Sequence, residues 1–338
     1  MLHQPIMAPG VYRISAERYH QDPAPEPSLS SSMAKTLVAE TPLDAWCDSQ
    51  RLNPNYEPPE DKDFDVGHAA HSLVLGVGAD FAECPAHHLS KNGAMGTNAA
   101  KAWAEDCREN GIVPLTPKQF NAVHSYADAV RGALKIHGIR FDPDRSEIAA
   151  LAHFEGVWNR MMADNAPVKS PYIYDLKTTG RGVSTDEMAR AVSNMRYDIS
   201  VAHYLRVWKE ATGEDRRMRL IFVSKPQGDK MKNRIPQVGI AELCNDGSGR
   251  LSSDFAQDEP FTGDWFADAE NDLSKARRIL RRCLDTGEWP GYPQRPALLG
   301  APIFHRRARA AAQRFDPIMP DEPSAEALER AAQWQSTE

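Results

Sequence analysis

The chain has 338 residues, of which 41% are hydrophobic, and its formal net charge is −7 at pH 7. This length suits one large domain or two small ones, with enough apolar residues to bury a sizeable core. No apolar run reaches the length of a membrane span and the first residues lack the pattern of a signal peptide, so we expect a soluble cytoplasmic protein that does not bind membranes.

Helices dominate the predicted structure of residues 11–140, which follow a flexible N-terminus of residues 1–10. The expected helices begin near Met33 behind a serine cap, cover residues 66–75, cover about 98–110, and run from Thr116 to about Lys135. The last of these has the clearest start, because Thr116, Pro117 and Gln119 form a capping box with proline in the first turn.

From residue 146 onward the hydrophobic period changes to that of strands. Expected strands cover residues 147–154, 157–163 and 171–177, then 219–224 and 237–242 after a helix over 184–212 that ends at Gly213. This order predicts an α+β fold with a mixed central sheet flanked by helices, in which residues 146–245 form the sheet core.

A further amphipathic helix is expected over residues 264–287, followed by a closing turn at Trp289-Pro-Gly-Tyr292. We therefore predict a single domain over residues 11–300, with 264–300 supplying its C-terminal helix and turn. Residues 301–338 are predicted to form a basic helix and an acidic tail.

Cysteine spacing and charge distribution narrow the classes of partner. Five cysteines are widely spaced, without the paired spacing of zinc sites or the four converging thiols of an iron–sulfur cluster, so free thiols are expected. Seven Lys and Arg residues lie between Arg216 and Arg234, while acidic residues crowd positions 57–65 and the C-terminal tail. The overall negative charge therefore does not exclude nucleic acid as a partner.

Asp175 and Lys177 are the strongest candidates for chemistry. Side chains two apart in a strand share one face, so these two point the same way while Leu176 faces the core. Asp164 ends the preceding strand and is expected to meet Asp175 at the sheet edge. Such a pair of carboxylates can hold Mg²⁺, and Lys177 can orient water or stabilise a charged transition state, with a lowered proton affinity. The alternative for an isolated Asp-x-Lys triplet is a surface ion pair.

Several segments in chain order resemble one nuclease family. They are Arg18-Tyr19-His20, Leu29-Ser-Ser-Ser-Met33, Ala39-Glu-Thr-Pro42, Gly67-His-Ala-Ala-His71, Lys101-Ala-Trp103, Asp175-Leu-Lys-Thr-Thr179 and Trp289-Pro-Gly-Tyr292. Together they resemble the PD-(D/E)xK nuclease superfamily, in its RecB-like branch, and within it the phage and prophage exodeoxyribonuclease VIII (RecE-type) catalytic domain. The resemblance spans roughly residues 12–292.

The resemblance implies roles for individual residues. Metal ligands would be His71, Asp164, Asp175 and the backbone carbonyl of Leu176. Lys177 would be the catalytic lysine, and Glu147 would support the metal cluster. Contacts to DNA would come from Tyr204, Ser200 and Arg160. Two positions depart from the family pattern: Ser200 stands where glutamine is usual, and the basic residue before Asp164 is displaced to Arg160.

Each assignment has a structural alternative. His71 can be a packing histidine, Glu147 a plain strand-start residue, and Tyr197 and Tyr204 core aromatics at helical spacing. The arginines from Arg277 to Arg282 are expected on a solvated helix face, with DNA-backbone contact as the lesser alternative.

The resemblance implies a Mg²⁺-dependent exonuclease, with Mn²⁺ as a possible substitute, that degrades one strand of linear double-stranded DNA from its ends for homologous recombination in a bacterial host cell. A ring-shaped homo-oligomer and a single-strand annealing partner are implied by the same family. Two alternatives remain open. One is a RecB- or Cas4-like repair nuclease with another end preference; the other is a non-catalytic DNA-binding protein that keeps the fold.

Overall fold

The computed structural model describes residues 4–58, 66–77, 80–224, 235–243, 265–296 and 299–314. Contacts divide the chain into two compact units, Met1–Gly291 and Tyr292–Glu338. No helix within the described ranges is long and apolar enough to cross a membrane. Four of the seven basic residues between Arg216 and Arg234, and the predicted acidic tail after residue 314, lie outside these ranges.

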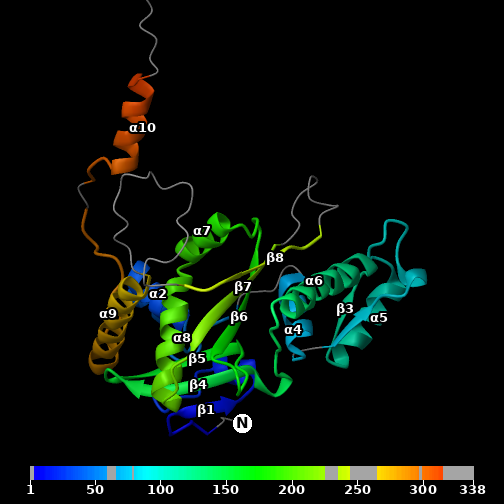
Figure 1. The fold of residues 1–338 in the computed structure, drawn as a ribbon, viewed down its shortest axis with the longest axis horizontal. Helices are drawn as coiled ribbons and strands as arrows, with labels where there is room; N and C mark the ends of the chain where they lie inside the picture. The colour runs from blue at the N-terminus through cyan, green and yellow to red at the C-terminus, as the bar shows by residue number, and fades with distance from the viewer. Residues whose placement is uncertain are drawn as a thin grey trace, which may run out of the picture. The chain divides into compact units, whose positions relative to one another are not determined.

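A six-stranded mixed sheet forms the centre of the first unit (Figure 1). In spatial order its strands are β1 (Gly10–Arg13), β4 (Ser146–Phe154), β5 (Val157–Asn165), β6 (Tyr172–Thr179), β7 (Arg217–Ser224) and β8 (Val238–Ala241). Strands β6 and β7 run parallel, and all other neighbours in the sheet are antiparallel. The predicted α+β fold with a mixed central sheet is therefore confirmed.

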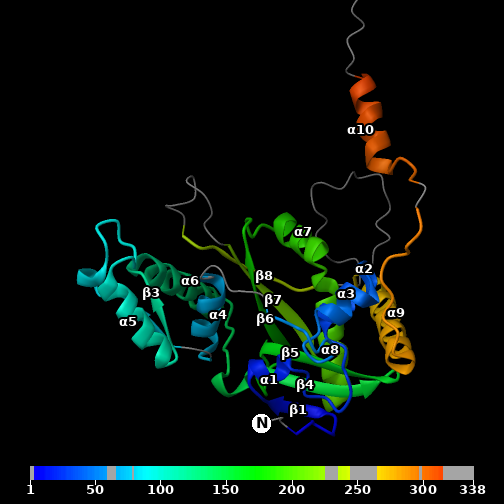
Figure 2. The ribbon, with the colours of Figure 1, turned by 180° about the vertical axis from the view of Figure 1, so that it is seen from behind.

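Helices cover both faces of this sheet, which explains why β4 and β5 are buried along most of their length instead of alternating. One face packs against α8 (Tyr197–Thr212), where Trp208 and Phe222 are buried. The other face packs against α4 (Val66–Leu75) and α6 (Pro117–Ile136), through Tyr126 and Leu176 among others. Figures 1 and 2 show the two helical layers from opposite sides.

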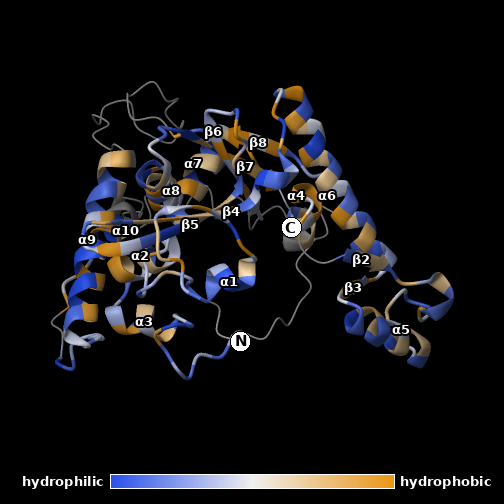
Figure 3. Cartoon of the chain, turned by 90° about the horizontal axis from the view of Figure 1, so that it is seen from below, coloured by the Kyte–Doolittle hydropathy of each residue, from blue (hydrophilic) through white to orange (hydrophobic). Residues whose placement is uncertain are grey.

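A second layer of helices lies outside α8. Helices α2 (Ser31–Ala39) and α9 (Trp265–Thr286) pack on α8 and on each other through small and aliphatic side chains. Hydrophobic and hydrophilic residues alternate along α9 as expected of a helix with one buried side (Figure 3). The turn after α9 docks on α3 (Pro42–Cys47), because Leu43 N–H donates to the carbonyl of Pro290. This contact fits the prediction of a closing turn in this segment.

The remaining elements of the first unit are short or peripheral. They are α1 (Ala16–His20), α5 (Asn98–Glu109), α7 (Thr185–Met195), a parallel pair β2 (Asp80–Glu83) and β3 (Ile112–Leu115), and two 3-10 turns, Ala86–His88 and Pro143–Arg145. The second unit contains α10 (Ile303–Arg314), whose Arg306, Arg307 and Arg309 are exposed.

Local sequence signals account for most helix boundaries. The capping box predicted for α6 is present, with the Thr116 hydroxyl accepting from Gln119 N–H and the Gln119 side chain accepting from Thr116 N–H. Helix α2 begins behind Ser30, whose hydroxyl accepts from Met33 N–H. These caps satisfy backbone donors that have no partner within the helix.

Two predictions about the elements are wrong, and three short strands were missed. The expected helix over 184–212 is two helices, because Arg196 adopts a left-handed conformation with φ of 50° between α7 and α8. Strands β1, β2 and β3 were not predicted, since four residues carry too short a pattern to distinguish from loop. Arg277 does not lie on a solvated helix face: it is 0% exposed and pairs with Glu155 and Glu270 at 3.0 and 2.9 Å.

Cys47, Cys84, Cys107 and Cys283 are free thiols, as expected, while Cys244 lies outside the described residues.

Candidate active site

Strands β5 and β6 bring Asp164 and Asp175 together where the two strands separate. Among the described residues their ladder consists of the single pair Asn165 and Tyr174. Beyond it, Asp164 Oδ2 accepts a hydrogen bond from Leu176 N–H at 2.5 Å, so a side chain takes the place of a backbone partner. The site therefore lies between two central strands, and the expectation that the carboxylates meet at the sheet edge is wrong.

Asp175 and Lys177 share one face of β6, as their spacing predicts. Asp175 is 2% exposed and its Oδ2 lies 2.5 Å from Lys177 Nζ. Oδ2 is buried and, apart from this ion pair, makes no hydrogen bond of regular geometry to the described residues. Leu176 between them packs into the core on the opposite face, as expected.

Helix α4 contributes His71, whose Nε2 lies 3.0 Å from Asp164 Oδ2. The preceding turn is made of small buried residues, Ala69 and Ala70, so the helix backbone can approach the sheet closely. The C-terminal end of α4 is fixed by Ser146, whose hydroxyl donates to the carbonyl of Leu75. The structure therefore places His71 beside Asp164, whereas the sequence alone left it open as a packing histidine.

Electrostatics at the site reflect buried groups of opposite charge. Burial raises the pKa of Asp175 to about 6; Lys177 opposes this rise and the nearby Asp164 adds to it. Burial also acts to raise the pKa of Asp164, but His71 and Lys177 outweigh it and the pKa is lowered. Burial acts to lower the pKa of His71, but the charge and hydrogen bond of Asp164, together with the charge of Asp175, outweigh burial and the pKa is raised.

A lowered proton affinity was expected for Lys177 beside a metal and its neighbours, and the protein groups alone act in the opposite direction. Burial does act to lower its pKa, but the carboxylates of Asp175 and Asp164 outweigh burial and the pKa is raised. Lys177 is therefore a cation in this site, suited to hold a negatively charged group.

Glu147 lies opposite Asp164 in the β4–β5 ladder. The pairs on either side are Ser146 with Asn165 and Ile148 with Ala163, so the register places Glu147 against Asp164. Its φ of 48° is in the left-handed region, which costs a non-glycine residue about 1–3 kcal/mol. Such strain within a central strand is typical of functional positions and fits a role beside the carboxylates.

Tyr197, Ser200 and Tyr204 recur at helical spacing on the face of α8 toward the site. Lys177 Nζ lies 5.2 Å from the centre of the Tyr197 ring. Burial raises the pKa of Tyr204, with smaller contributions from Tyr19, Asp175 and Asp164 and an opposing hydrogen bond with Ser31. Ser200 is buried and its side chain makes no hydrogen bond to the described residues. The structure thus brings Tyr204 near both carboxylates.

Arg160 lies apart from this group. It is 8% exposed, and its NH1 donates to the carbonyl and hydroxyl of Ser28 and pairs with Asp22 at 3.0 Å. The guanidinium is thus engaged inside the protein, which gives Arg160 a structural place in contrast to the DNA contact implied by the family resemblance.

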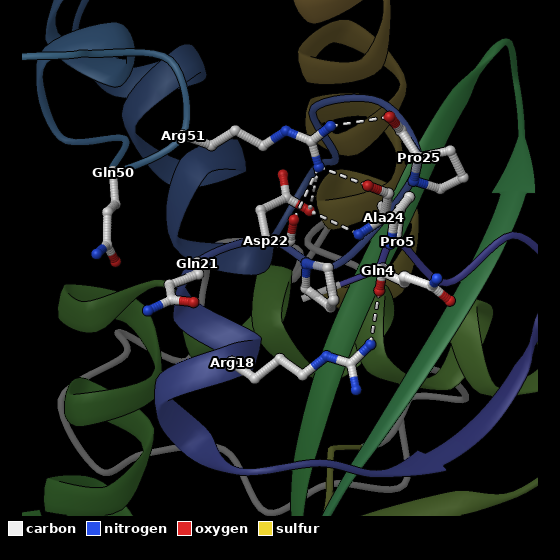
Figure 4. A pocket seen from close by; sticks show the side chains of 10 residues that line it. Gln4, Pro5, Arg18, Gln21, Asp22, Ala24, Pro25, Gln50 and Arg51 are labelled. Atoms are coloured by element: carbon white, nitrogen blue, oxygen red, sulfur yellow. Dashed lines mark hydrogen bonds and ion pairs between the residues drawn. The ribbon is translucent and has the colours of Figure 1, made fainter. Parts of the chain in front are cut away.

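A cavity of about 650 Å³ adjoins the same buried Asp22. Arg18, Gln21, Gln50 and Arg51 line it, and Figure 4 shows Arg51 directed to the carbonyl groups of the 22–25 loop. None of the carboxylates of the candidate site lines this cavity, so we regard it as a separate feature.

The donor set fits a hard divalent cation, although no three His, Cys, Asp or Glu side chains in the described ranges are already arranged as a metal cluster. Instead, His71 Nε2 lies beside Asp164, and Lys177 forms an ion pair with Asp175. The buried Oδ2 of Asp175 and the opposed Asp164 supply the oxygen ligands that Mg²⁺ prefers.

Sequence reasoning missed one charged residue here, Lys35 of α2, whose Nζ lies 5.2 Å from the centre of the Tyr197 ring. The available signal was its position one helical turn after Ser31, on a helix in which Met33, Ala34 and Leu37 are buried.

No family model and no curated protein sequence matches this chain. Among solved structures, a putative exonuclease from Eubacterium rectale superposes with a TM-score of 0.52 at 15% identity, covering 86% of this chain and 96% of that one. A phage-related exonuclease from Haemophilus somnus 129PT gives a TM-score of 0.31 at 14% identity, covering 65% of this chain and 95% of that one. The chain therefore shares its fold with the Eubacterium rectale protein.

Proposed function

We propose that this protein is a Mg²⁺-dependent exodeoxyribonuclease that hydrolyses phosphodiester bonds of linear double-stranded DNA. The observation that carries the proposal is the meeting of Asp164, Asp175 and Lys177 in a buried gap between β5 and β6. Buried carboxylates of like charge are unfavourable unless a cation balances them, and a functional centre is the usual reason for such a cluster.

The residues divide the chemistry between them. Asp164 and Asp175, with the backbone carbonyl of Leu176 and the imidazole of His71, would hold the metal. A bound Mg²⁺ would supply Lewis-acid stabilisation of charge on the phosphate and a water of lowered pKa. Lys177 stays charged beside the carboxylates and would stabilise the additional negative charge of the transition state.

The fold shared with a putative exonuclease from Eubacterium rectale supports a nuclease over other hydrolases that use paired carboxylates. The resemblance of the Asp175–Thr179 segment to PD-(D/E)xK nucleases of RecE type supports DNA ends as the substrate. Roles in recombination, a ring-shaped homo-oligomer, an annealing partner and a cytoplasmic location in a bacterial host are proposed on that resemblance.

The test compares end-labelled linear duplex with closed circular duplex, each incubated with the purified chain and Mg²⁺, Mn²⁺ or EDTA. Asp175→Ala and the exposed-site control Asp144→Ala are measured in parallel. We expect digestion of linear DNA only, lost with EDTA and with Asp175→Ala and retained in the control. Cleavage of circles would replace the proposal with an endonuclease, and binding without hydrolysis would leave a DNA-binding protein.

Subunit number is tested separately by native mass spectrometry. A closed oligomer of three or more chains is the expected result, and a monomer at working concentration would contradict the ring.

A further inference from the structure

Helix α2 lies across α8 with two side-chain contacts that fix its placement. The Ser31 side chain lies beside that of Tyr204, and one turn later Lys35 Nζ lies 5.2 Å from the centre of the Tyr197 ring. Because residues four apart in α2 meet residues seven apart in α8 in reversed order, the two helices run antiparallel along this face. This arrangement brings Lys35 to the N-terminal end of α8, beside the carboxylate site.

Lys35 and Lys177 thus approach the same aromatic ring. Each Nζ lies 5.2 Å from the centre of Tyr197, so the two ammonium groups are separated by no more than twice that distance. They come from different elements, α2 and β6. The hydroxyl-bearing ring that both approach is half-buried and packs on Phe222 of β7.

The anions near Lys35 are already paired with other cations. Asp175 pairs with Lys177 at 2.5 Å. Asp198 accepts hydrogen bonds from Arg196, which also pairs with Asp272. Lys35 itself forms no ion pair with another residue in the described ranges. Lys35 is therefore a half-buried cation that lies near other cations and has no ion-pair partner among the described residues.

The pKa of Lys35 agrees with the excess of cations around it. Burial, followed by the repulsion from Lys177, lowers its pKa to about 8, although Asp175 and Asp198 act in the opposite direction. A group in this position gains more from an incoming anion than an exposed lysine does, because it has less water to give up.

We infer that Lys35 is a substrate-binding residue that contacts a phosphodiester group of DNA held between it and Lys177. This inference rests on the proposed nuclease function and adds a residue from outside the sheet core. It assigns Tyr197 the role of stabilising both cations through its ring.

The test measures DNA binding in EDTA, where hydrolysis does not interfere. Fluorescence anisotropy gives the Kd of a labelled linear duplex for the wild type, Lys35→Gln, Lys35→Arg and the exposed control Lys275→Gln. We expect Lys35→Gln to weaken binding about tenfold or more, the value of a charged hydrogen bond, and to make the salt dependence shallower by about one phosphate contact. Lys35→Arg should retain most of the affinity, and the control all of it.

Duplexes with a single uncharged methylphosphonate, placed in turn at each of the terminal linkages, locate the contact. At one position the wild type should lose affinity to the level of Lys35→Gln, while Lys35→Gln loses no more. Equal losses in both proteins at every position, or wild-type affinity in Lys35→Gln, would overturn the inference. Thermal unfolding identifies a misfolded Lys35→Gln, in which case Lys35→Met, which also removes the charge and keeps the length of the side chain, takes its place in the methylphosphonate series.

Failure of the proposed function is recognised independently. Wild-type protein that cleaves no DNA with Mg²⁺ or Mn²⁺ refutes the nuclease, whereas the methylphosphonate comparison depends only on binding.

Discussion

His203 predicts a pH-dependent loss of stability that can be worked out from its surroundings. The side chain is 0% exposed, and its Nε2 lies 3.0 Å from the carbonyl of Arg160 while Nδ1 has no partner among the described residues. Burial lowers its pKa from 6.5 to about 3; the backbone of Arg160 and Leu29 opposes this, and the charges of Arg277 and Arg160 add to it. His203 therefore remains neutral in the folded protein above pH 4 or so.

The sign follows from the unfolded state, which binds the proton at its ordinary pKa of 6.5 when the folded state does not. Stability from the neutral histidine is fully present above pH 6.5 and is lost as the pH falls toward 3, by up to about 1.4 kcal/mol per pH unit. Between pH 8 and pH 5 the loss amounts to about 2 kcal/mol. His203→Gln removes the titrating group while keeping an amide that can donate to the Arg160 carbonyl.

Urea unfolding followed by circular dichroism at pH 8, 7, 6 and 5 measures the effect. The free energy of unfolding of His203→Gln relative to the wild type should rise by about 2 kcal/mol between pH 8 and pH 5. His137→Gln, at an exposed position, is the matched control and should show no such change. A constant difference between His203→Gln and the wild type across this range would refute the reasoning.

Three further predictions concern stability at named positions. Arg277→Met removes both ion pairs of a buried guanidinium and should lower the free energy of unfolding by about 2–3 kcal/mol. The control Arg278→Met, at an exposed site, should lower it by less than about 0.5 kcal/mol. Equal effects of the two substitutions in chemical denaturation would contradict the burial of Arg277. Glu147→Gly should be more stable than Glu147→Ala by roughly 1 kcal/mol, because only glycine adopts a φ of 48° without strain. The reverse order of stability in urea unfolding would count against backbone strain at this position. Thr116→Ala should cost about 1 kcal/mol through loss of the α6 cap, and Thr116→Ser should cost much less in the same assay.

The sequence predicts most of the sheet core because its strands carry long and continuous signals. The two strands that flank Glu155-Gly156 and the aromatic strand Tyr172–Thr179 each extend over eight or nine residues, which leaves little ambiguity in period. The break at Arg196 was not predictable in the same way. A left-handed arginine is stabilised by its pairing with Asp198 and with Asp272 of a distant helix, a tertiary contact that no local pattern records.

In the candidate site, too, the features set by local geometry were predictable and those set by tertiary packing were not. Asp175 and Lys177 are two apart in one strand, so their common face follows from local geometry alone. The position of Asp164 between diverging strands, and the approach of His71 from α4, depend on how separate elements pack. Lys35 lies furthest from any local signal, since its nearness to Lys177 arises only from the crossing of α2 on α8.

Arg160 and Arg277 are charged residues whose burial could not be predicted from the sequence. Both are arginines in segments where a contact with DNA is a natural hypothesis, and both are buried with internal carboxylate partners. Sequence composition gives the charge of a residue but not whether that charge is already paired inside the fold.

The central claim is that Asp164 and Asp175 bind a divalent cation. Lys177 is not a ligand of this cation but acts with it in catalysis. Titration of Mn²⁺ followed by electron paramagnetic resonance tests it most directly, with the wild type, Asp175→Asn and Lys177→Gln compared at the same protein concentration. Wild type and Lys177→Gln are predicted to bind the ion, and Asp175→Asn to lose at least about tenfold in affinity, in line with the loss of a charged oxygen ligand. Unchanged Mn²⁺ affinity in Asp175→Asn would contradict the assignment of this site as the metal centre.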